Sequence, residues 1–154
     1  RLRFEGRGHG LDLQIEALEL ATANAERLGC AVDFHRIDIL QQQPADGIFS
    51  TPFDVILSNP PYIPQSDRSE MLPNVLDWEP PMALFVEDDD PLLFYRRIIE
   101  GCDTQRWLTP GGLLGVECHR DAVTEVLDLL SRKWTAKECL RDLQGNWRMV
   151  FARG

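Results

Sequence analysis

The sequence lacks the features that mark several common functional classes. Its four cysteines contain no C-x-x-C pair, so neither a zinc knuckle nor a thiol redox motif is predicted. The cysteines are Cys30, Cys102, Cys118 and Cys139. No apolar run approaches the roughly 20 residues needed to span a bilayer, and residues 1–10 are too polar for a secretory signal. We therefore expect reduced thiols, no membrane association and a cytoplasmic location.

A metal site is not expected either. Cys118 and His119 are adjacent in the sequence and could in principle ligate one ion. Neighbouring residues of a strand, however, point to opposite faces of the sheet, which makes joint ligation awkward.

Clustered positive charge is missing as well. The 16 Lys and Arg residues are outnumbered by 25 Asp and Glu residues, which gives a formal net charge of −9 at pH 7. No group of Lys and Arg residues stands out along the chain. Because nucleic-acid-binding surfaces are basic, this balance argues against direct nucleic-acid binding.

What the sequence does contain fits a single α/β domain. Of its 154 residues, 44% are hydrophobic, which is enough for a sizeable core. Residues 8–13 are typical of a short strand, and residues 16–28 of an amphipathic helix that stops at Gly29. Residues 31–39 and 53–58 are typical of two more strands. Because parallel strands need long crossover connections, this order predicts a parallel sheet.

The rest of the chain is predicted to complete the same sheet. We expect a polar loop over 41–51 and an irregular stretch over 63–90. A helix is expected over 91–108, opened by Pro91 and broken by residues 109–112, and a second helix over 120–134. Strands are expected over 113–119, 135–143 and 147–153. The last two strands flank a short turn, so they are expected to pair antiparallel at the edge of the sheet.

Polar residues stand at the ends of three of these strands, which is where open parallel sheets bind ligands. Asp12 could accept hydrogen bonds from both hydroxyls of a ribose, because a carboxylate offers two acceptor oxygens. Asp38 could accept from the amino group of an adenine while the Ile39 N–H reaches a ring nitrogen. Taken singly, either acid could instead form a turn or cap a helix.

The third strand end carries the tetrad Asn59-Pro60-Pro61-Tyr62. The prolines fix φ and lack N–H groups, so the loop is stiff and keeps free carbonyl acceptors. Such a loop suits the methylation of a planar nitrogen. The side-chain oxygen of Asn59 and the carbonyl oxygen of Pro60 could accept its two N–H hydrogens while Tyr62 stacks on its flat face. Alternatively, the prolines merely end a strand and Tyr62 packs in the core.

Several blocks of the sequence resemble the peptide chain release factor glutamine methyltransferases of the HemK/PrmC type. These blocks are "DLQIEALELATANAERLG", "LSNPPYIP", "VLDWEPPMALFVEDDDPLLFYRRII", "LTPGGLLGVE" and "DLQGNWRMVFAR". The tetrad alone is shared with adenine and guanine amino methyltransferases, whereas the later blocks are more specific.

The resemblance implies a Rossmann-like class I S-adenosylmethionine-dependent methyltransferase with a mainly parallel sheet. Its implied substrate is the glutamine amide of a Gly-Gly-Gln loop on a release factor. Asp12, Asp38, Ile39 and Asn59 would bind the cofactor. The tetrad would bind the substrate amide, with Asn59, Pro60 and Tyr62 in catalytic roles. The protein is expected to be monomeric, with release factors as partners.

The sequence also departs from the family. Asp12-Leu13-Gln14-Ile15 stands where similar sequences often read Asp-Ile-Ser-Pro, and Ile39 stands where an aromatic is common. No glycine-rich cofactor loop is present, and "GRGHG" at residues 6–10 is a poor substitute because it precedes the Asp12 strand. We therefore interpret residues 1–154, which begin at Arg1, as a catalytic domain truncated at its N-terminus that lacks its first strand. This fragment alone is expected to be inactive.

Two other interpretations of the function stay open. A nucleic-acid amino methyltransferase could use the same tetrad, and a non-catalytic module could keep the fold without the cofactor. Within the long stretch after the tetrad, Trp78, Glu79 and Pro80 are expected either to form a lip over the substrate loop or simply to pack.

Overall fold

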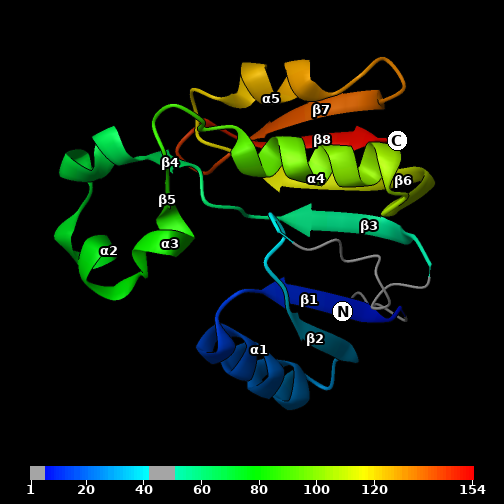
Figure 1. Cartoon of the computed structure of the whole chain (residues 1–154), viewed down its shortest axis with the longest axis horizontal. Coiled ribbons are helices and arrows are strands. Elements are labelled where there is room, and N and C mark those ends of the chain that lie inside the picture. Colours follow the sequence, from blue (N-terminus) through cyan, green and yellow to red (C-terminus); the bar gives the residue numbers. More distant parts are fainter. Residues whose placement is uncertain (1–5, 42–50) are drawn as a thin grey trace. The chain divides into compact units, whose positions relative to one another are not determined.

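The computed structural model describes residues 6–41 and 51–154, which divide at residue 48 into an N-terminal and a C-terminal unit (Figure 1). Most of the loop predicted over 41–51 lies outside the described residues. No helix in the described ranges is long and apolar enough to cross a membrane.

The N-terminal unit is one strand, helix, strand motif. It consists of β1 (Gly8–Asp12), α1 (Ile15–Leu28) and β2 (Val32–Arg36). The two strands pair in parallel, from Gly8 opposite Val32 to Asp12 opposite Arg36, as predicted. Helix α1 ends where Gly29 adopts a left-handed φ of 65°, and its N–H bonds the carbonyls of Ala25 and Glu26. Gln14 precedes the helix without a side-chain cap, as its departure from Ser suggested.

The C-terminal unit contains a four-stranded sheet in the order β3-β6-β8-β7. Its strands are β3 (Phe53–Ser58), β6 (Leu108–Glu117), β7 (Thr135–Arg141) and β8 (Trp147–Arg153). Strands β3 and β6 are parallel, and β8 runs antiparallel to both β6 and β7. The predicted antiparallel pair at the edge of the sheet is therefore confirmed.

Two helices supply the core of this unit together with the sheet. They are α4 (Leu93–Thr104) and α5 (Val123–Leu129) (Figure 1). The buried side chains include Tyr95, Ile98 and Ile99 of α4, Val123 and Val126 of α5, and Leu114, Val116, Val150 and Ala152 of the central strands. Each large apolar side chain that is fully buried contributes about 1.5–3 kcal/mol, so this cluster gives the sheet its main support.

Several boundaries differ from the predictions: α4 ends at Thr104 and not at 108, and α5 spans Val123–Leu129 and not 120–134. Helix α4 begins at Leu93, so Pro91 lies before the helix and not in its first turn. Residues 109–112 do not separate the helix from the strand but belong to β6. The register of β6 on β3 shifts between Phe53 and Val55, and Gly111 has a φ of 78°, so an irregular start of the strand accommodates the Pro and Gly residues.

The long stretch after the tetrad is a chain of short elements. They are β4 (Ile63–Pro64), the 3₁₀ helix η1 (Gln65–Glu70), α2 (Pro73–Trp78), α3 (Pro81–Leu84) and β5 (Phe85–Val86). Strands β4 and β5 pair in parallel and so join the two ends of the stretch (Figure 1). We call residues 65–84 the clasped segment.

Candidate functional site

The Asn59–Tyr62 tetrad leaves the end of β3 directly and enters β4. Asn59 is exposed, Pro60 is buried, and Tyr62 is half-buried. The backbone N–H of Tyr62 donates to the carbonyl of Leu84 at 3.3 Å, beside the β4–β5 pair. The tetrad is therefore held between the central sheet and the clasped segment.

Asn59 and Pro60 keep the acceptors that the predicted clamp needs. In the described part of the chain, neither the Asn59 side-chain amide nor the Pro60 carbonyl makes a hydrogen bond. The prolines remove local donors, which explains why such a carbonyl stays available. The exposed Asn59 side chain could therefore bond an incoming carboxamide or amino group, whereas Pro60 is buried and its carbonyl has no hydrogen bond among the described residues.

Tyr62 is fixed by a residue distant in the sequence. Its hydroxyl donates to Oε1 of Glu117 at 2.7 Å. Glu117 is the last residue of β6, which pairs with β3 up to Ser58 opposite Val116. Burial raises the pKa of Tyr62 to about 12, and the hydrogen bond and charge of Glu117 act in the same direction, whereas Arg148 acts in the opposite one. Tyr62 is thus a neutral hydrogen-bond donor at physiological pH.

A turn between β7 and β8 places Arg148 near this pair. The Asp142 carboxylate accepts the N–H groups of Gln144 at 3.0 Å and Asn146 at 2.9 Å, and both Nε and Nη2 of Arg148 at 3.2 Å. Burial alone would raise the pKa of Asp142, but these hydrogen bonds together with the Arg148 charge lower it below its usual value. Arg148 also bonds the carbonyl of Cys118, at 3.4 Å.

The sequence analysis did not identify Glu117, Asp142 and Arg148 as neighbours of the tetrad. The signals were indirect: Glu117 ends the "LTPGGLLGVE" block, and Asp142 and Arg148 belong to the terminal "DLQGNWR" block, both of which carry the family resemblance. Nothing in the spacing of these residues indicates that Tyr62 would meet Glu117.

The two predicted cofactor acids lie in the N-terminal unit, at the carboxyl end of its parallel pair. Oδ1 of Asp12 accepts the Gln14 N–H at 2.8 Å, and Oδ1 of Asp38 accepts the Leu40 N–H at 3.0 Å. The Ile37 N–H donates to the carbonyl of Asp12 at 3.0 Å, which brings the segment after β2 beside the end of β1. Both acids therefore form turns, as the alternative interpretation expected, and each keeps its second carboxylate oxygen for a ligand.

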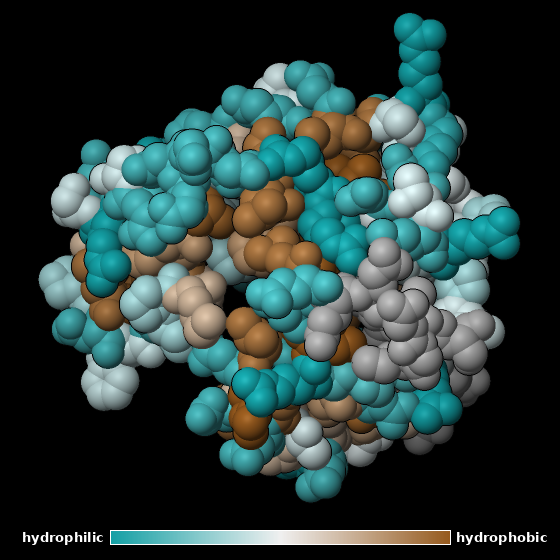
Figure 2. Space-filling model, in the orientation of Figure 1, coloured by the Kyte–Doolittle hydropathy of each residue, from teal (hydrophilic) through white to brown (hydrophobic). Residues whose placement is uncertain are grey.

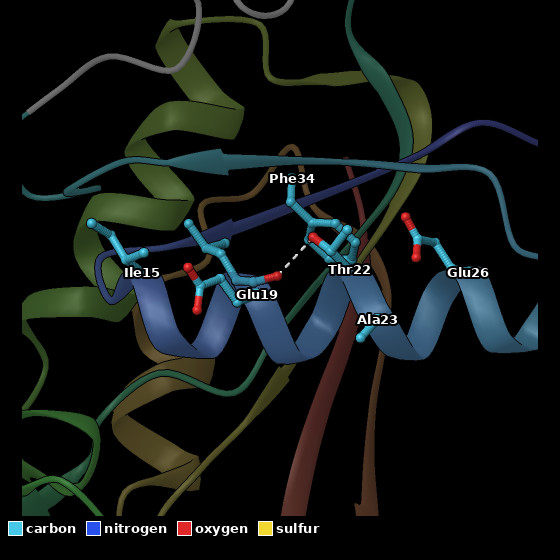
Figure 3. Close-up of a pocket in the computed structure, with 7 residues that line it drawn as sticks. Ile15, Glu19, Thr22, Ala23, Glu26 and Phe34 are labelled. Carbon is cyan, nitrogen blue, oxygen red and sulfur yellow. Dashed lines mark hydrogen bonds between the residues drawn. The ribbon is translucent and has the colours of Figure 1, made fainter.

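A groove in the N-terminal unit does not coincide with these acids. It lies between α1 and the Phe34 ring, and its wall includes Ile15, Glu19, Thr22, Ala23 and Glu26 (Figure 3). The Thr22 hydroxyl donates to the Leu18 carbonyl at 2.7 Å and so satisfies itself within the helix. None of the predicted site residues contributes to the groove, and we assign it no function.

Cys118 is buried, whereas the neighbouring His119 is half-buried and lies near Tyr62. The Cys118 thiol is directed to the Val116 carbonyl at 3.7 Å, and the His119 ring lies 6.4 Å from the Tyr62 ring, centroid to centroid. Among the described residues, no group of three or more His, Cys, Asp and Glu side chains could hold a metal ion.

Comparisons with solved structures define the class of fold. The structure of TrmN from Thermus thermophilus aligns with 96% of this chain and 36% of its own, with a TM-score of 0.61 and 20% identity. A release-factor-specific protein-(glutamine-N5) methyltransferase from Alicyclobacillus acidocaldarius aligns with 96% of this chain and 78% of its own, with a TM-score of 0.51 and 23% identity. The fold is that of the class I S-adenosylmethionine-dependent methyltransferases, and the fold prediction is confirmed.

Sequence comparison narrows the resemblance. A release factor glutamine methyltransferase from Bacteroides thetaiotaomicron is 40% identical over 142 residues, which is 92% of this chain and 49% of the relative. The chain spans about half the length of the release factor glutamine methyltransferases that it matches. No family model matches the sequence. The predicted resemblance to the release factor glutamine methyltransferases is confirmed.

Proposed function

We propose that the protein containing this chain methylates the side-chain amide nitrogen of the glutamine in a Gly-Gly-Gln loop of peptide chain release factors. The observation that carries this proposal is the Asn59–Tyr62 loop, in which two free acceptors follow one another and an anchored ring stands beside them. The protein would act in the cytoplasm, as a monomer, with release factors as its partners.

The loop meets the main chemical difficulty of the reaction. The lone pair of an amide nitrogen is delocalised, so the nitrogen is a poor nucleophile. When the Asn59 side-chain oxygen and the Pro60 carbonyl accept its two N–H hydrogens, the lone pair is directed to one side of the amide plane. The Tyr62 ring, held by Glu117, then packs against the flat face of the amide.

The N-terminal unit offers hydrogen-bonding groups that fit S-adenosylmethionine. Asp12 is exposed and could accept from the ribose hydroxyls, while Asp38 and the Ile39 N–H could bond the adenine. Asn59 would contribute from its own strand end. When bound, the cofactor supplies the electrophilic methyl group.

The test is single-turnover methyl transfer by the full-length protein to a purified release factor, followed by mass spectrometry of the tryptic peptide that carries Gly-Gly-Gln. We expect one methyl group on the glutamine and none on a release factor in which this glutamine is replaced by alanine. Methyl transfer that persists on the replaced protein, or that occurs on DNA or RNA instead, would overturn the substrate assignment.

Cofactor binding is measured separately, by thermal shift of the full-length protein. S-adenosylmethionine at 100 times its dissociation constant should stabilise the folded protein by about 2.7 kcal/mol. The absence of any shift would instead support a non-catalytic module that keeps only the fold.

A further inference from the structure

Tyr62 follows β3 at the same end of the C-terminal sheet as the start of β8, which carries Arg148. The Tyr62 hydroxyl donates to Glu117 Oε1 at 2.7 Å. Arg148 is held by Asp142 at 3.2 Å, and its charge acts on both Tyr62 and Glu117. The direct contact that fixes the ring of the tetrad is therefore the hydrogen bond to Glu117.

The Glu117 side chain starts from a rigid backbone. Glu117 pairs with Met149 of β8. Its carbonyl accepts the hydroxyl of Tyr95 at 3.0 Å, and Tyr95 is only 1% exposed. A carboxylate that begins at the end of a central strand can hold a partner in one place, because pairing with β8 fixes its backbone.

We propose that Glu117 is a positioning residue that holds the Tyr62 ring against the substrate amide. The proposal rests on the methyl transfer proposed above. It gives the end of β6 a role in catalysis without requiring that Glu117 touch substrate or cofactor.

The physical reason is orientation. A half-buried tyrosine in a loop can turn about its side-chain bonds, and a ring that turns away from the flat face of the amide no longer keeps the nitrogen aligned. The bond to Glu117 removes this freedom. Loss of the bond should therefore lower the rate of the transfer step and leave the binding of S-adenosylmethionine unchanged.

Four variants of the full-length protein separate positioning from stability. Tyr62→Phe and Glu117→Ala each remove the hydrogen bond, and we expect kcat to fall by roughly tenfold or more with KM for the release factor changed much less. Glu117→Gln keeps a side-chain oxygen that can accept the phenol hydrogen, so it should recover most of the activity lost in Glu117→Ala. The double variant Tyr62→Phe, Glu117→Ala should be no slower than the worse single variant, because both changes break one contact.

Tyr95→Phe is the matched control. It removes a hydroxyl that donates to the same glutamate, but the acceptor is the backbone carbonyl of Glu117 and not its carboxylate. We expect this variant to lose stability while its kcat stays within about twofold of the wild type. Equal losses of kcat in Tyr95→Phe and Glu117→Ala would point to a purely structural effect and would overturn the proposal.

A spectroscopic readout is independent of activity. This chain has two tyrosines, and Tyr62→Phe and Tyr95→Phe each remove one signal and so assign it when the full-length protein is labelled with ¹³C at the tyrosine ζ carbon. At pH 8 both hydroxyls are protonated, because burial raises the pKa of each tyrosine. Glu117→Ala should shift the Tyr62 signal and leave the Tyr95 signal in place.

The outcomes distinguish the two proposals. An inactive wild-type protein with a Tyr62 signal that responds to Glu117→Ala contradicts the proposed function but not the contact. An active wild-type protein whose Glu117→Ala variant is equally active refutes the positioning role.

Discussion

The side-chain hydrogen bonds of Asp12 and Asp38 in the N-terminal unit reach two residues along the chain, whereas Tyr62 in the C-terminal unit bonds Glu117, 55 residues away. The acids are therefore shaped by their own turns. The tetrad is shaped by the packing of a whole sheet, because Glu117 is located only once β6 has paired with its neighbours.

The two units also differ in how many apolar side chains they bury. Among the described residues, all buried apolar side chains except Ala25 and Ile37 belong to the C-terminal unit. The tetrad is therefore attached to a unit with a hydrophobic core, whereas Asp12 and Asp38 belong to a small, lightly packed motif. Four changes test this contrast.

The largest effect is expected on stability, from Ile98→Ala. Ile98 is 2% exposed in the core of the C-terminal unit, so its truncation should lower the free energy of unfolding by about 2–5 kcal/mol. The matched change in the N-terminal unit is Leu28→Ala, since Leu28 is 61% exposed and should cost less than about 0.5 kcal/mol. Urea denaturation of the full-length variants measures both costs. Similar losses would show that another part of the protein covers α1.

Asn59→Ala should reduce turnover by at least the ~10²-fold typical of losing one aligned polar group at a reacting centre, with cofactor affinity changed far less. Asn59→Asp is expected to be clearly impaired, but less so than Ala. A carboxylate still accepts hydrogen bonds, yet its charge stabilises the cationic cofactor more than the neutralised transition state. Single-turnover transfer to a release factor checks both. Near-wild-type transfer by Asn59→Ala would remove the clamp from the mechanism.

Asp12→Ala should act on the other half of the proposed site. Two hydrogen bonds from a carboxylate to ribose are worth roughly 1.5 to 3 kcal/mol, so the dissociation constant of S-adenosylmethionine should rise while the amide clamp stays intact. Asp33→Ala is the control, because Asp33 is a carboxylate of the neighbouring strand that pairs with Arg7 at 2.7 Å. Calorimetric titration compares the two variants. An unchanged affinity in Asp12→Ala excludes Asp12 from cofactor binding.

Much of the fold could be predicted because its main elements carry local signals. The β3 strand matches the predicted 53–58, and α1 stops at Gly29 because a left-handed residue is needed there. The β4–β5 pair was not predicted, since strands of two residues have no periodicity. The sequence predicts a break between helix and strand at residues 109–112, because Pro and Gly usually end strands. In the structure, β6 accommodates them at its irregular start, which depends on its pairing with β3.

The sequence predicts the chemical groups of the candidate site, but not the residues that hold Tyr62 in place. Asn59 to Tyr62 are adjacent, so their joint use could be inferred from the sequence alone. The contact of Tyr62 with Glu117 depends on how β6 is placed beside β3, and the approach of Arg148 depends on the β7–β8 turn. Such contacts arise from tertiary packing, which residue spacing does not encode.

The smallest expected effect concerns the clasped segment. Trp78 is 84% exposed at the end of α2, and Glu79 and Pro80 are exposed beside it, which favours a lip that contacts the release factor over simple packing. Figure 2 shows that apolar side chains (brown) reach the surface among polar ones (teal) on one face of the molecule.

Trp78→Ala should raise KM for the release factor roughly fivefold, the effect of losing an interface aromatic worth about 1 kcal/mol, with kcat at saturation and cofactor affinity unchanged. Leu143→Ala is the control, because Leu143 is an apolar residue in the β7–β8 turn that is even more exposed than Trp78 and should leave KM unchanged. Steady-state transfer at varied release factor concentration distinguishes them. If Trp78→Ala instead lowers the unfolding free energy and leaves KM alone, Trp78 packs against a part of the protein outside the described residues. The clasped segment would then serve the fold, and the substrate contacts would be confined to the tetrad.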